Sequence, residues 1–238
     1  MNRLETVFLP TVDSTNTHAR HLIDDGSKLP FMVVAKEQTA GRGRRGRTFF
    51  SQGGLYMSLA IETENIGVES LKLTSLVAVA TLRVLDRYTN SRPMIKWVND
   101  IFLDGKKLGG ILCEAVTDSK TNAVIIGIGL NIGNVAFPEE LSGIATNLAI
   151  DGISCEDLAG EICTEILTMW AKNENYIEEY RFRSLLLGKD IVCYDNNKVY
   201  EATALDVDDD AALIVALPDS TTKKLSSGEV TLRIKEAQ

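Results

Sequence analysis

The stretch QTAGRGRRGRTFFS, residues 38–51, is the segment from which the organisation of this chain is read most directly. Four arginines and three glycines lie between Gly41 and Arg47. Glycine lets backbone N–H groups come close to a ligand, and arginine presents planar, permanently charged donors that match carboxylate and phosphate oxygens. Because an unpaired arginine is costly to bury, this stretch does not suit a packed core. We therefore interpret residues 38–51 as an anion-binding loop.

Two simpler interpretations of this loop are a solvated charged surface and a disordered nucleic-acid-binding segment. The flanking runs FMVVA (31–35) and LYMSLAI (55–61) are apolar and strand-like, so the loop connects elements of a folded sheet. The chain as a whole is acidic, with a formal net charge of −8, so the loop is a local basic island. It matches neither the Walker A sequence nor the dinucleotide-binding fingerprint, because no helical pattern begins at its glycines.

Length and composition indicate an ordinary folded protein. The 238 residues, 45% hydrophobic and 24% charged, suffice for one large domain or a large and a small one. The acidic balance argues against bulk attraction to DNA or anionic membranes, and no apolar signal core or membrane-spanning run is present. The four cysteines include no C-x-x-C pair, which favours reduced thiols in the cytoplasm. With only two histidines, a His-based zinc site or a Ser-His-Asp triad is not expected.

Hydrophobic periodicity predicts an α+β sheet domain over most of the chain. Helices are expected after the capping residues DSTN (13–16), with Gly26 as the stop, and over residues 68–88. The Asp104-Gly105 pair is a strong hairpin signal. The expected strands are residues 31–35, 55–61, 94–98, 101–103, 106–114 and 123–131.

The composition changes in the last quarter of the chain. A capping box at Ser154 and Asp157 opens a helix that is expected to extend to Leu187, with Gly188 as its stop. Four short strands separated by polar turns then predict a small all-β barrel of about 50 residues. These strands are residues 191–194, 199–207, 211–217 and 230–234. The pattern predicts two domains, residues 1–187 and 188–238.

Five motifs, in this order, resemble the motif set of biotin protein ligases. They are DSTN at 13–16, Gln38 with GRGRRGR at 41–47, KWVND at 96–100, KLGGIL at 107–112 and GIGLN at 127–131. The resemblance covers nearly the whole chain. It implies a mixed sheet packed on helices, similar to class II aminoacyl-tRNA synthetases, followed by an SH3-like domain. It also implies that ATP, with Mg²⁺, activates biotin to biotinyl-5′-AMP, and that the biotinyl group passes to one lysine of a biotin carboxyl carrier domain.

The resemblance and the residue types together indicate candidate catalytic and ligand-binding residues. Lys107 and Arg44 are expected to hold biotin's carboxylate and the α-phosphate, and Asp100 to orient the incoming lysine or a magnesium ion. No set of metal ligands is identified. Biotin's uncharged ureido head needs neutral donors and acceptors, and glycines allow close approach of the ring. The expected biotin-binding residues are Ser14, Thr15, Asn16, Gln38, Gly41, Arg42, Gly43, Arg44, Lys107, Gly110, Gly127 and Gly129. The expected ATP- and adenylate-binding residues are Arg44, Arg45, Arg47, Phe49, Asn99, Lys107 and Asn131.

Two residues depart from the family's usual pattern. Val98 stands where proline is usual, so the strand is expected to persist there with a less rigid turn. Phe49 stands where many relatives stack adenine on tryptophan, and it offers a smaller face without an N–H. Trp97 can also be interpreted as a core residue, and Cys113, within an apolar strand, as a packing residue.

Two other functions remain as alternatives at this stage. A lipoate ligase or octanoyl transferase would also transfer a carboxylic acid to a carrier lysine, but it needs an apolar slot without polar head contacts. A nucleic-acid-binding module would use the Arg-Gly loop. Only thirteen residues precede Ser14, too few for a helix-turn-helix, so no DNA partner is expected. The choice between a monomer and a homodimer stays open.

Overall fold

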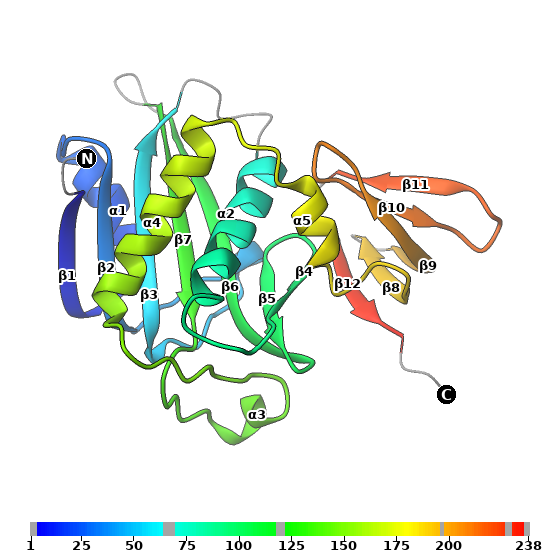
Figure 1. Ribbon diagram of the computed structural model, residues 1–238, viewed down its shortest axis with the longest axis horizontal. Helices are drawn as coiled ribbons and strands as arrows, with labels where there is room; N and C mark the ends of the chain where they lie inside the picture. Colours follow the sequence, from blue (N-terminus) through cyan, green and yellow to red (C-terminus); the bar gives the residue numbers. More distant parts are fainter. Residues whose placement is uncertain (1–3, 64–69, 118–121, 196–197, 227–229, 236–238) are drawn as a thin grey trace.

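A computed structural model describes residues 4–63, 70–117, 122–195, 198–226 and 230–235. Within them a seven-stranded mixed sheet has helices on both faces, and a five-stranded sheet follows (Figure 1). The first sheet comprises β1 (Glu5–Val12), β2 (Phe31–Gln38), β3 (Gln52–Glu62), β4 (Met94–Lys96), β5 (Asp100–Leu103), β6 (Lys106–Thr117) and β7 (Asn122–Leu130). The helices are α1 (Thr15–Asp24), α2 (Ser70–Leu85), α3 (Glu139–Ser142), α4 (Cys155–Ala171) and α5 (Ile177–Phe182).

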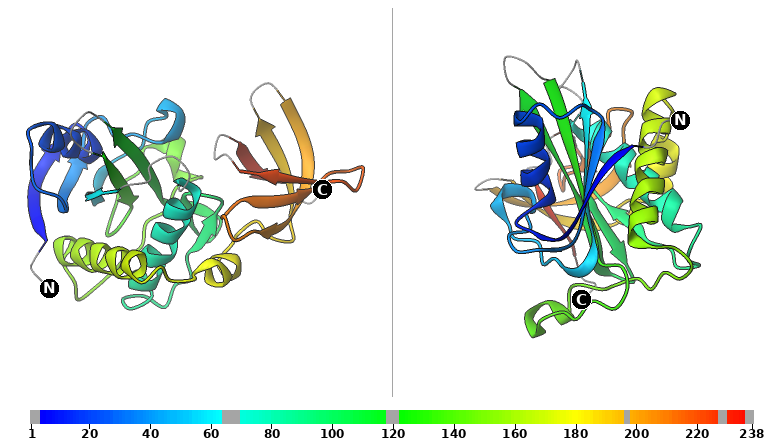
Figure 2. Two further views of the ribbon diagram at one scale, coloured as in Figure 1. Left: turned by 90° about the horizontal axis from the view of Figure 1, so that it is seen from above. Right: turned by 90° about the vertical axis from the view of Figure 1, so that its left-hand side faces the viewer.

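The large sheet has the order β1-β2-β3-β7-β6-β5-β4. Only the β1–β2 pair is parallel, and the remaining neighbours are antiparallel. Helices α2 and α4 cover one face and α1 covers part of the other, as the two views of Figure 2 show. The predicted mixed sheet packed on helices is therefore confirmed.

Successive side chains of β3 and β7 point to opposite faces of the sheet, and one of these faces is filled by core side chains. Met57, Leu59, Ile126 and Ile128 belong to the main core with α2 and α4. On the opposite face the two glycines of β7 leave the sheet without bulky side chains near the start of α1. The same GIG pattern that builds the core on one side therefore leaves room for a site on the other.

A bulge in β6 changes which face its first residues present. Ile101 of β5 pairs with Gly109, whereas the next residue, Phe102, pairs with Lys107, so Leu108 is the extra residue. A bulge re-aims the side chains on either side of it. Consistent with this, a Cβ added to Gly110 would lie 3.5 Å from Lys107 Nζ. The bulge thus brings Lys107 to the face that carries the open area.

The five-stranded sheet forms the C-terminal SH3-like domain. Its strands are β8 (Asp190–Asp195), β9 (Lys198–Val207), β10 (Leu213–Ala216), β11 (Thr222–Leu225) and β12 (Thr231–Ile234), in the order β11-β10-β9-β8-β12. Trp97 Nε1 donates to Ala211 O at 2.9 Å, and Arg47 Nη2 donates to Thr231 Oγ1 at 3.0 Å. These two contacts fasten the small domain to the turn after β4 and to the Arg-Gly loop.

Several details of the sequence prediction are wrong. The helix from Ser154 does not extend to Leu187: α4 ends at Ala171, the backbone turns at Asn173 with φ 47°, and α5 is a separate short helix. The strand does not persist through Val98, because β4 ends at Lys96 and a turn follows. The elements β1, α3 and β11 were not predicted, because their short or polar sequences carry weak periodicity.

Other local predictions are confirmed. The Asp104-Gly105 turn has φ of 49° and 76°, the left-handed pair that a tight hairpin needs. Ser154 Oγ accepts a hydrogen bond from Asp157 N at 3.0 Å and caps α4. Part of the expected helix over 68–88 falls outside the described residues, and in the described part α2 ends at Leu85, before the expected end at residue 88. In the part of the chain that the structure describes, no helix is both long and apolar enough to cross a membrane. The division between residues 187 and 188 stays a prediction.

Candidate functional site

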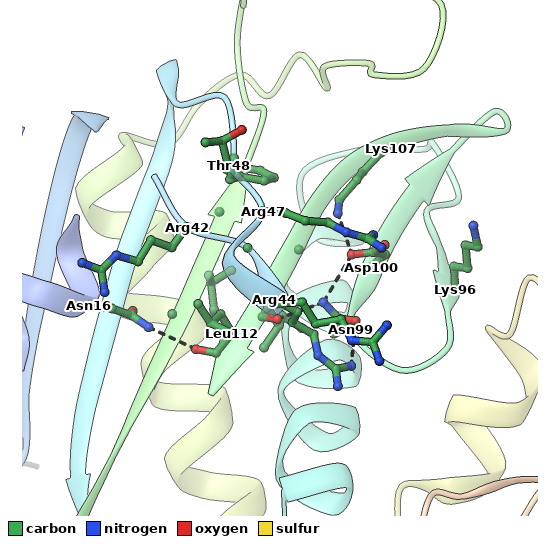
Figure 3. A pocket seen from close by; sticks show the side chains of 18 of the residues that line it. Asn16, Arg42, Arg44, Arg47, Thr48, Lys96, Asn99, Asp100, Lys107 and Leu112 are labelled. Carbon is green, nitrogen blue, oxygen red and sulfur yellow. Dashed lines mark hydrogen bonds and ion pairs between the residues drawn. The ribbon is translucent and has the colours of Figure 1, made fainter. Parts of the chain in front are cut away.

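A pocket opens on the α1 side of the large sheet, between the Arg-Gly loop, the β4–β5 turn and strand β12 (Figure 3). Two rows of paired residues form its floor. Asp100, Gly110 and Gly129 are register partners across β5, β6 and β7, and Leu112 and Gly127 form the next row. Ser14, Thr15, Asn16, Gln38, Arg42, Gly43, Arg44, Arg45, Arg47, Phe49, Asn99 and Lys107 also line the pocket. Most of the residues expected at the site therefore meet in one cavity.

One end of the pocket is neutral and polar. It lies at the start of α1, where Thr15 N donates to Gln38 Oε1 at 2.9 Å and Thr15 Oγ1 lies 3.2 Å from the same oxygen. Gln38 Nε2 donates to Ser51 Oγ at 2.9 Å. The Ser14 side chain makes no capping hydrogen bond to the helix. The side chains of Ser14, Thr15 and Gln38 at this end are hydroxyl and amide groups without a formal charge, and Arg42, which also lines the pocket, lies near Asn16 in Figure 3.

The two glycines of β7 are needed for side chains of the protein itself. A Cβ added to Gly127 would lie 2.3 Å from Asn16 Oδ1, and one added to Gly129 would lie 2.7 Å from the Phe49 ring. Asn16 and Phe49 thus occupy the space above the two glycines. The expectation that these glycines let biotin's ring come close stays a prediction; the groups above Gly127 and Gly129 in this structure are Asn16 and Phe49.

The other end of the pocket is cationic. Lys107 Nζ lies 2.6 Å from Asp100 Oδ1 and 5.8 Å from the centre of the Phe49 ring. Arg44 Nη1 donates to Asn99 Oδ1 at 3.3 Å, and Asn99 Nδ2 donates to Ile111 O at 3.1 Å. The two expected catalytic cations are therefore held by consecutive residues, Arg44 by Asn99 and Lys107 by Asp100. Figure 3 shows them on the side of the pocket away from Asn16.

Lys96 adds a further cation at the far side of the pocket. Burial lowers the pKa of its ammonium group, against the opposing effect of Asp100. The positive charges of Lys107, Arg233 and Arg47 lower this pKa further. The same positive charges around Lys96 favour the entry of an anion into this part of the pocket.

The Arg-Gly loop is a tight turn in this structure. Arg42 and Thr48 form an isolated bridge, and Gly43 N donates to Arg47 O at 2.7 Å. The chain reverses its direction at Arg45 and Gly46, whose φ angles of 59° and 69° are left-handed. The arginine side chains consequently leave the turn in different directions around the pocket rather than along one surface.

Two predicted site residues lie away from the pocket wall. Gly41 is buried against Phe49 O and Ser51 Oγ, each 2.4 Å from the position of an added Cβ. Asn131 is 4% exposed, and its Nδ2 donates to Thr146 O at 3.1 Å. Cys113 packs against the main core, as expected, and burial raises the pKa of its thiol to about 11. A thiol that stays protonated at neutral pH is a poor nucleophile.

Sequence reasoning missed several residues at or beneath the site, among them Lys96, Thr231, Ser58 and Glu114. Lys96 and Thr231 line the pocket, whereas Ser58 and Glu114 contact the residues that line it. The sequence did mark Ser58, because it is the one aliphatic hydroxyl in the otherwise largely apolar run LYMSLAI. Nothing in the sequence marked Thr231, because its contact with Arg47 joins residues far apart in the chain and depends on how the two sheets pack together.

Comparison with known proteins agrees with this geometry. The model of the biotin/lipoate A/B protein ligase family matches residues 8–131, and the biotin protein ligase C-terminal domain matches residues 187–233. The chain belongs to the biotin/lipoate A/B protein ligase family, and its second match marks it as one of the biotin protein ligases.

Individual relatives extend over nearly the whole chain. The bifunctional ligase/repressor BirA of Bacillus spizizenii is 30% identical over 239 residues, which cover 95% of this chain and 73% of that protein. A biotin–[acetyl-CoA-carboxylase] ligase of Mycobacterium tuberculosis is 29% identical, with 91% and 85% covered. The biotin protein ligase of Aquifex aeolicus, solved in complex with biotin and ATP, superposes with a TM-score of 0.84 at 25% identity, covering 97% of this chain and 99% of that one.

Proposed function

We propose that this chain is a biotin–[acetyl-CoA-carboxylase] ligase. It joins biotin to ATP, forming biotinyl-5′-AMP and pyrophosphate, and then transfers the biotinyl group to one lysine of a biotin carboxyl carrier domain. The observation that carries the proposal is that one pocket has a neutral polar end and a cationic end. Biotin has the matching form, with an uncharged ureido head at one end of the molecule and a carboxylate at the other.

Hydrogen counting at the neutral end supports a ureido ligand. The single hydroxyl hydrogen of Thr15 is used inside the protein, on Gln38 Oε1 at 3.2 Å, and Ser58 Oγ donates to Thr15 Oγ1 at 2.8 Å. Toward the pocket, Thr15 can therefore only accept. Gln38 keeps one amide hydrogen after its bond to Ser51, and the Ser14 hydroxyl can also donate. A ureido group has N–H donors for the first residue and a carbonyl for the other two.

The cationic end suits the adenylation step. Biotin's carboxylate oxygen forms a bond to the α-phosphorus, while the bond from that phosphorus to the bridging oxygen breaks and pyrophosphate leaves. Both reactants are anions, so the enzyme has to offset their repulsion before they meet. We assign this task to Lys107 and Arg44, with Arg45, Arg47 and Lys96 toward the departing pyrophosphate. Phe49, with its ring beside Lys107, is the candidate for contact with the adenine.

Asp100 has a narrower role in this account than the sequence suggested. It accepts from Lys107 Nζ at 2.6 Å and lies 3.3 Å from Asn99 Nδ2. The carboxylate therefore holds the catalytic ammonium in place until an anionic substrate draws it away. In the second step the same carboxylate can attract the incoming carrier lysine, whose amine attacks the acyl carbon and displaces AMP.

Magnesium is best regarded as part of the ATP substrate. The described residues contain no group of three His, Cys, Asp or Glu side chains that could hold a metal ion. Mg²⁺ commonly keeps several waters and is bound largely by substrate phosphates. We therefore expect it to enter with the triphosphate. The cytoplasm is the proposed compartment, and the four free cysteines fit a reducing environment.

The first prediction concerns substrate choice. Purified protein given ATP and Mg²⁺ should add a biotinyl mass to a single lysine of a carrier domain, because the head-group end offers polar partners that a dithiolane or an alkyl chain cannot use. Intact-mass spectrometry with equimolar biotin, lipoate and octanoate measures the preference. A carrier with its acceptor lysine changed to arginine is the control. Lipoate incorporation at the biotin rate would contradict the proposal.

The second prediction concerns nucleic acid. The arginines of the loop line the ligand pocket, and the net charge of the chain is −8. We therefore expect no sequence-specific DNA binding by this chain. A gel-shift titration at low and moderate salt, with the promoter DNA of the carrier or biotin-synthesis genes, is the measurement. A shift confined to one sequence and weakened by salt would overturn this expectation.

A further inference from the structure

The C-terminal sheet reaches the pocket through the start of β12. Val230, Thr231 and Leu232 line the pocket together with the Arg-Gly loop. Leu232 is 4% exposed and packs in the main core, so alternation along β12 turns the neighbouring Thr231 to the other face of the strand. There Thr231 Oγ1 accepts a hydrogen bond from Arg47 Nη2 at 3.0 Å. One hydroxyl group of the small sheet thus holds the end of a cationic side chain that belongs to the loop.

Backbone and side-chain contacts between the two sheets fix the position of Thr231. Residues 183–185 pair with Ile95 of β4 and extend the large sheet, through hydrogen bonds of 2.7 and 2.8 Å. The indole of Trp97, in the turn after β4, donates to Ala211 O of the small sheet at 2.9 Å. The hydroxyl of Thr231 is therefore an acceptor whose place relative to the pocket is set by the fold.

Both ends of the Arg47 side chain are held. Its backbone closes the turn of the Arg-Gly loop, because Gly43 N donates to Arg47 O at 2.7 Å and Arg47 N donates to Arg44 O at 3.3 Å. Its guanidinium is bonded to Thr231, although the residue as a whole is exposed. An exposed arginine without such a partner samples many rotamers, and ordering it on binding weakens affinity. The bond to Thr231 therefore orders Arg47 before a ligand binds.

The ordered guanidinium lies at the cationic end of the pocket. Arg47 and Lys96 both line the pocket, and burial lowers the pKa of Lys96, which the positive charge of Arg47 lowers further. Figure 3 shows Arg47 on the same side of the pocket as Lys107 and Asp100. A guanidinium has five N–H groups, so it can donate to Thr231 and to phosphate oxygens at the same time. An anion that enters this end meets a positive charge already in place.

We propose that Thr231 is a positioning residue for the adenylation step, which holds the Arg47 guanidinium in place for the pyrophosphate part of ATP. The inference rests on the proposed function, in which Arg47 faces the departing pyrophosphate. It gives the C-terminal sheet a part in the first half-reaction, through one hydroxyl group that acts by way of Arg47. The neutral end of the pocket is built from other residues, so its affinity for biotin should not depend on Thr231.

The test measures biotin-dependent exchange of labelled pyrophosphate into ATP by Thr231→Val, which keeps the shape of the side chain and removes the hydroxyl. The KM values for ATP and pyrophosphate should rise about 3–10-fold, the expected effect of leaving one long side chain to be ordered by its ligand. The KM for biotin should stay at the wild-type value. Thr231→Ser keeps a hydroxyl and should recover most of the loss. Thr222→Val, at an exposed position of β11, is the matched control.

A double-mutant cycle shows whether Thr231 acts through Arg47. Arg47→Ala should raise the same two KM values at least as much as Thr231→Val does, and adding Thr231→Val to Arg47→Ala should change nothing further. A hydroxyl that only stabilises the fold, or that binds ATP by itself, would give two effects that multiply. Thr231→Ala supplies the same comparison if Thr231→Val does not fold.

Four results would overturn the inference. They are multiplied effects in the double variant, wild-type KM values for ATP and pyrophosphate in Thr231→Val, an equal rise of the biotin KM, and a Thr231→Ser variant as defective as Thr231→Val. The proposed function can fail separately. If the wild-type protein exchanged pyrophosphate with lipoate and not with biotin, the proposed function would be contradicted, and the cycle would then be measured with lipoate. Biotin-dependent wild-type exchange, with Thr231→Val at the wild-type KM values, would contradict the Thr231 inference alone.

Discussion

Substitution of Lys107 by alanine is expected to slow pyrophosphate exchange about 10²–10³-fold, the usual effect of removing one preorganised charge from a developing anion. The bulge at Leu108 turns Lys107 toward the pocket, and Asp100 holds its ammonium at 2.6 Å. Its loss leaves the attacking carboxylate and the α-phosphate with one cation fewer between them. The measurement is the rate of biotin-dependent exchange of labelled pyrophosphate into ATP at saturating substrates.

The neighbouring Lys106 is the matched control for this substitution. It lies on the same hairpin, but its Nζ donates to Ser142 O at 3.0 Å in an exposed position. Lys106→Ala should exchange pyrophosphate at the wild-type rate. The Lys107–Asp100 pair is partly exposed, so its loss should cost no more than about 1 kcal/mol of stability, and a rate loss would not reflect unfolding. If Lys107→Ala exchanged pyrophosphate at the wild-type rate, Lys107 would be only a lysine at a strand edge, without a role in adenylation.

Substitution of Arg44 by glycine is expected to release biotinyl-5′-AMP before it reaches the carrier. Arg44 connects the Arg-Gly loop to the β4–β5 turn through Asn99 Oδ1 at 3.3 Å, so it can hold the loop across the pocket. A glycine-rich loop loses much conformational entropy when it becomes ordered, and bound anions offset the repulsion among its arginines. Closure also keeps water away from the mixed anhydride. Without this anchor, the adenylate should be made and then lost.

The measurement is biotin labelling of an unrelated lysine-rich protein mixed with the variant, biotin and ATP. Labelling of this bystander should exceed the wild-type level several-fold, while transfer to the carrier falls. Arg44→Lys keeps the positive charge and removes the planar guanidinium group, so it shows which of the two matters. The control is Arg92→Gly, which changes an exposed arginine outside the pocket. Equal bystander labelling, with amide exchange in residues 38–51 unchanged by biotin, would leave loop closure without support.

The sequence carried enough information for most of the fold because its signals are local. Helix α1 begins within the DSTN motif, although the Ser14 side chain makes no capping hydrogen bond, the Asp104-Gly105 turn closes its hairpin, and alternation in the sequence marks β3. The errors fall where tertiary contacts decide. The break between α4 and α5 occurs at Asn173, where neither glycine nor proline announces it, and β1 forms only by pairing with β2.

The candidate site was predictable as a set of residues but not as an arrangement. Side-chain chemistry pointed to Ser14, Thr15 and Gln38 for a neutral head and to Arg44 and Lys107 for anions. Tertiary packing decides which of these side chains form hydrogen bonds with one another. The sequence could not show that Asn16 covers Gly127, that Asp100 binds Lys107, or that Thr231 reaches Arg47 from the other domain.

The central claim is that this pocket activates biotin, and pyrophosphate exchange tests it most directly. The purified chain is incubated with ATP, Mg²⁺, labelled pyrophosphate and one acid at a time, in the absence of a carrier. The account predicts that label enters ATP with biotin, at a rate that Lys107→Ala lowers about 10²–10³-fold, and at background level with lipoate or octanoate. Exchange that proceeds equally well with lipoate, or that biotin does not stimulate, would contradict it.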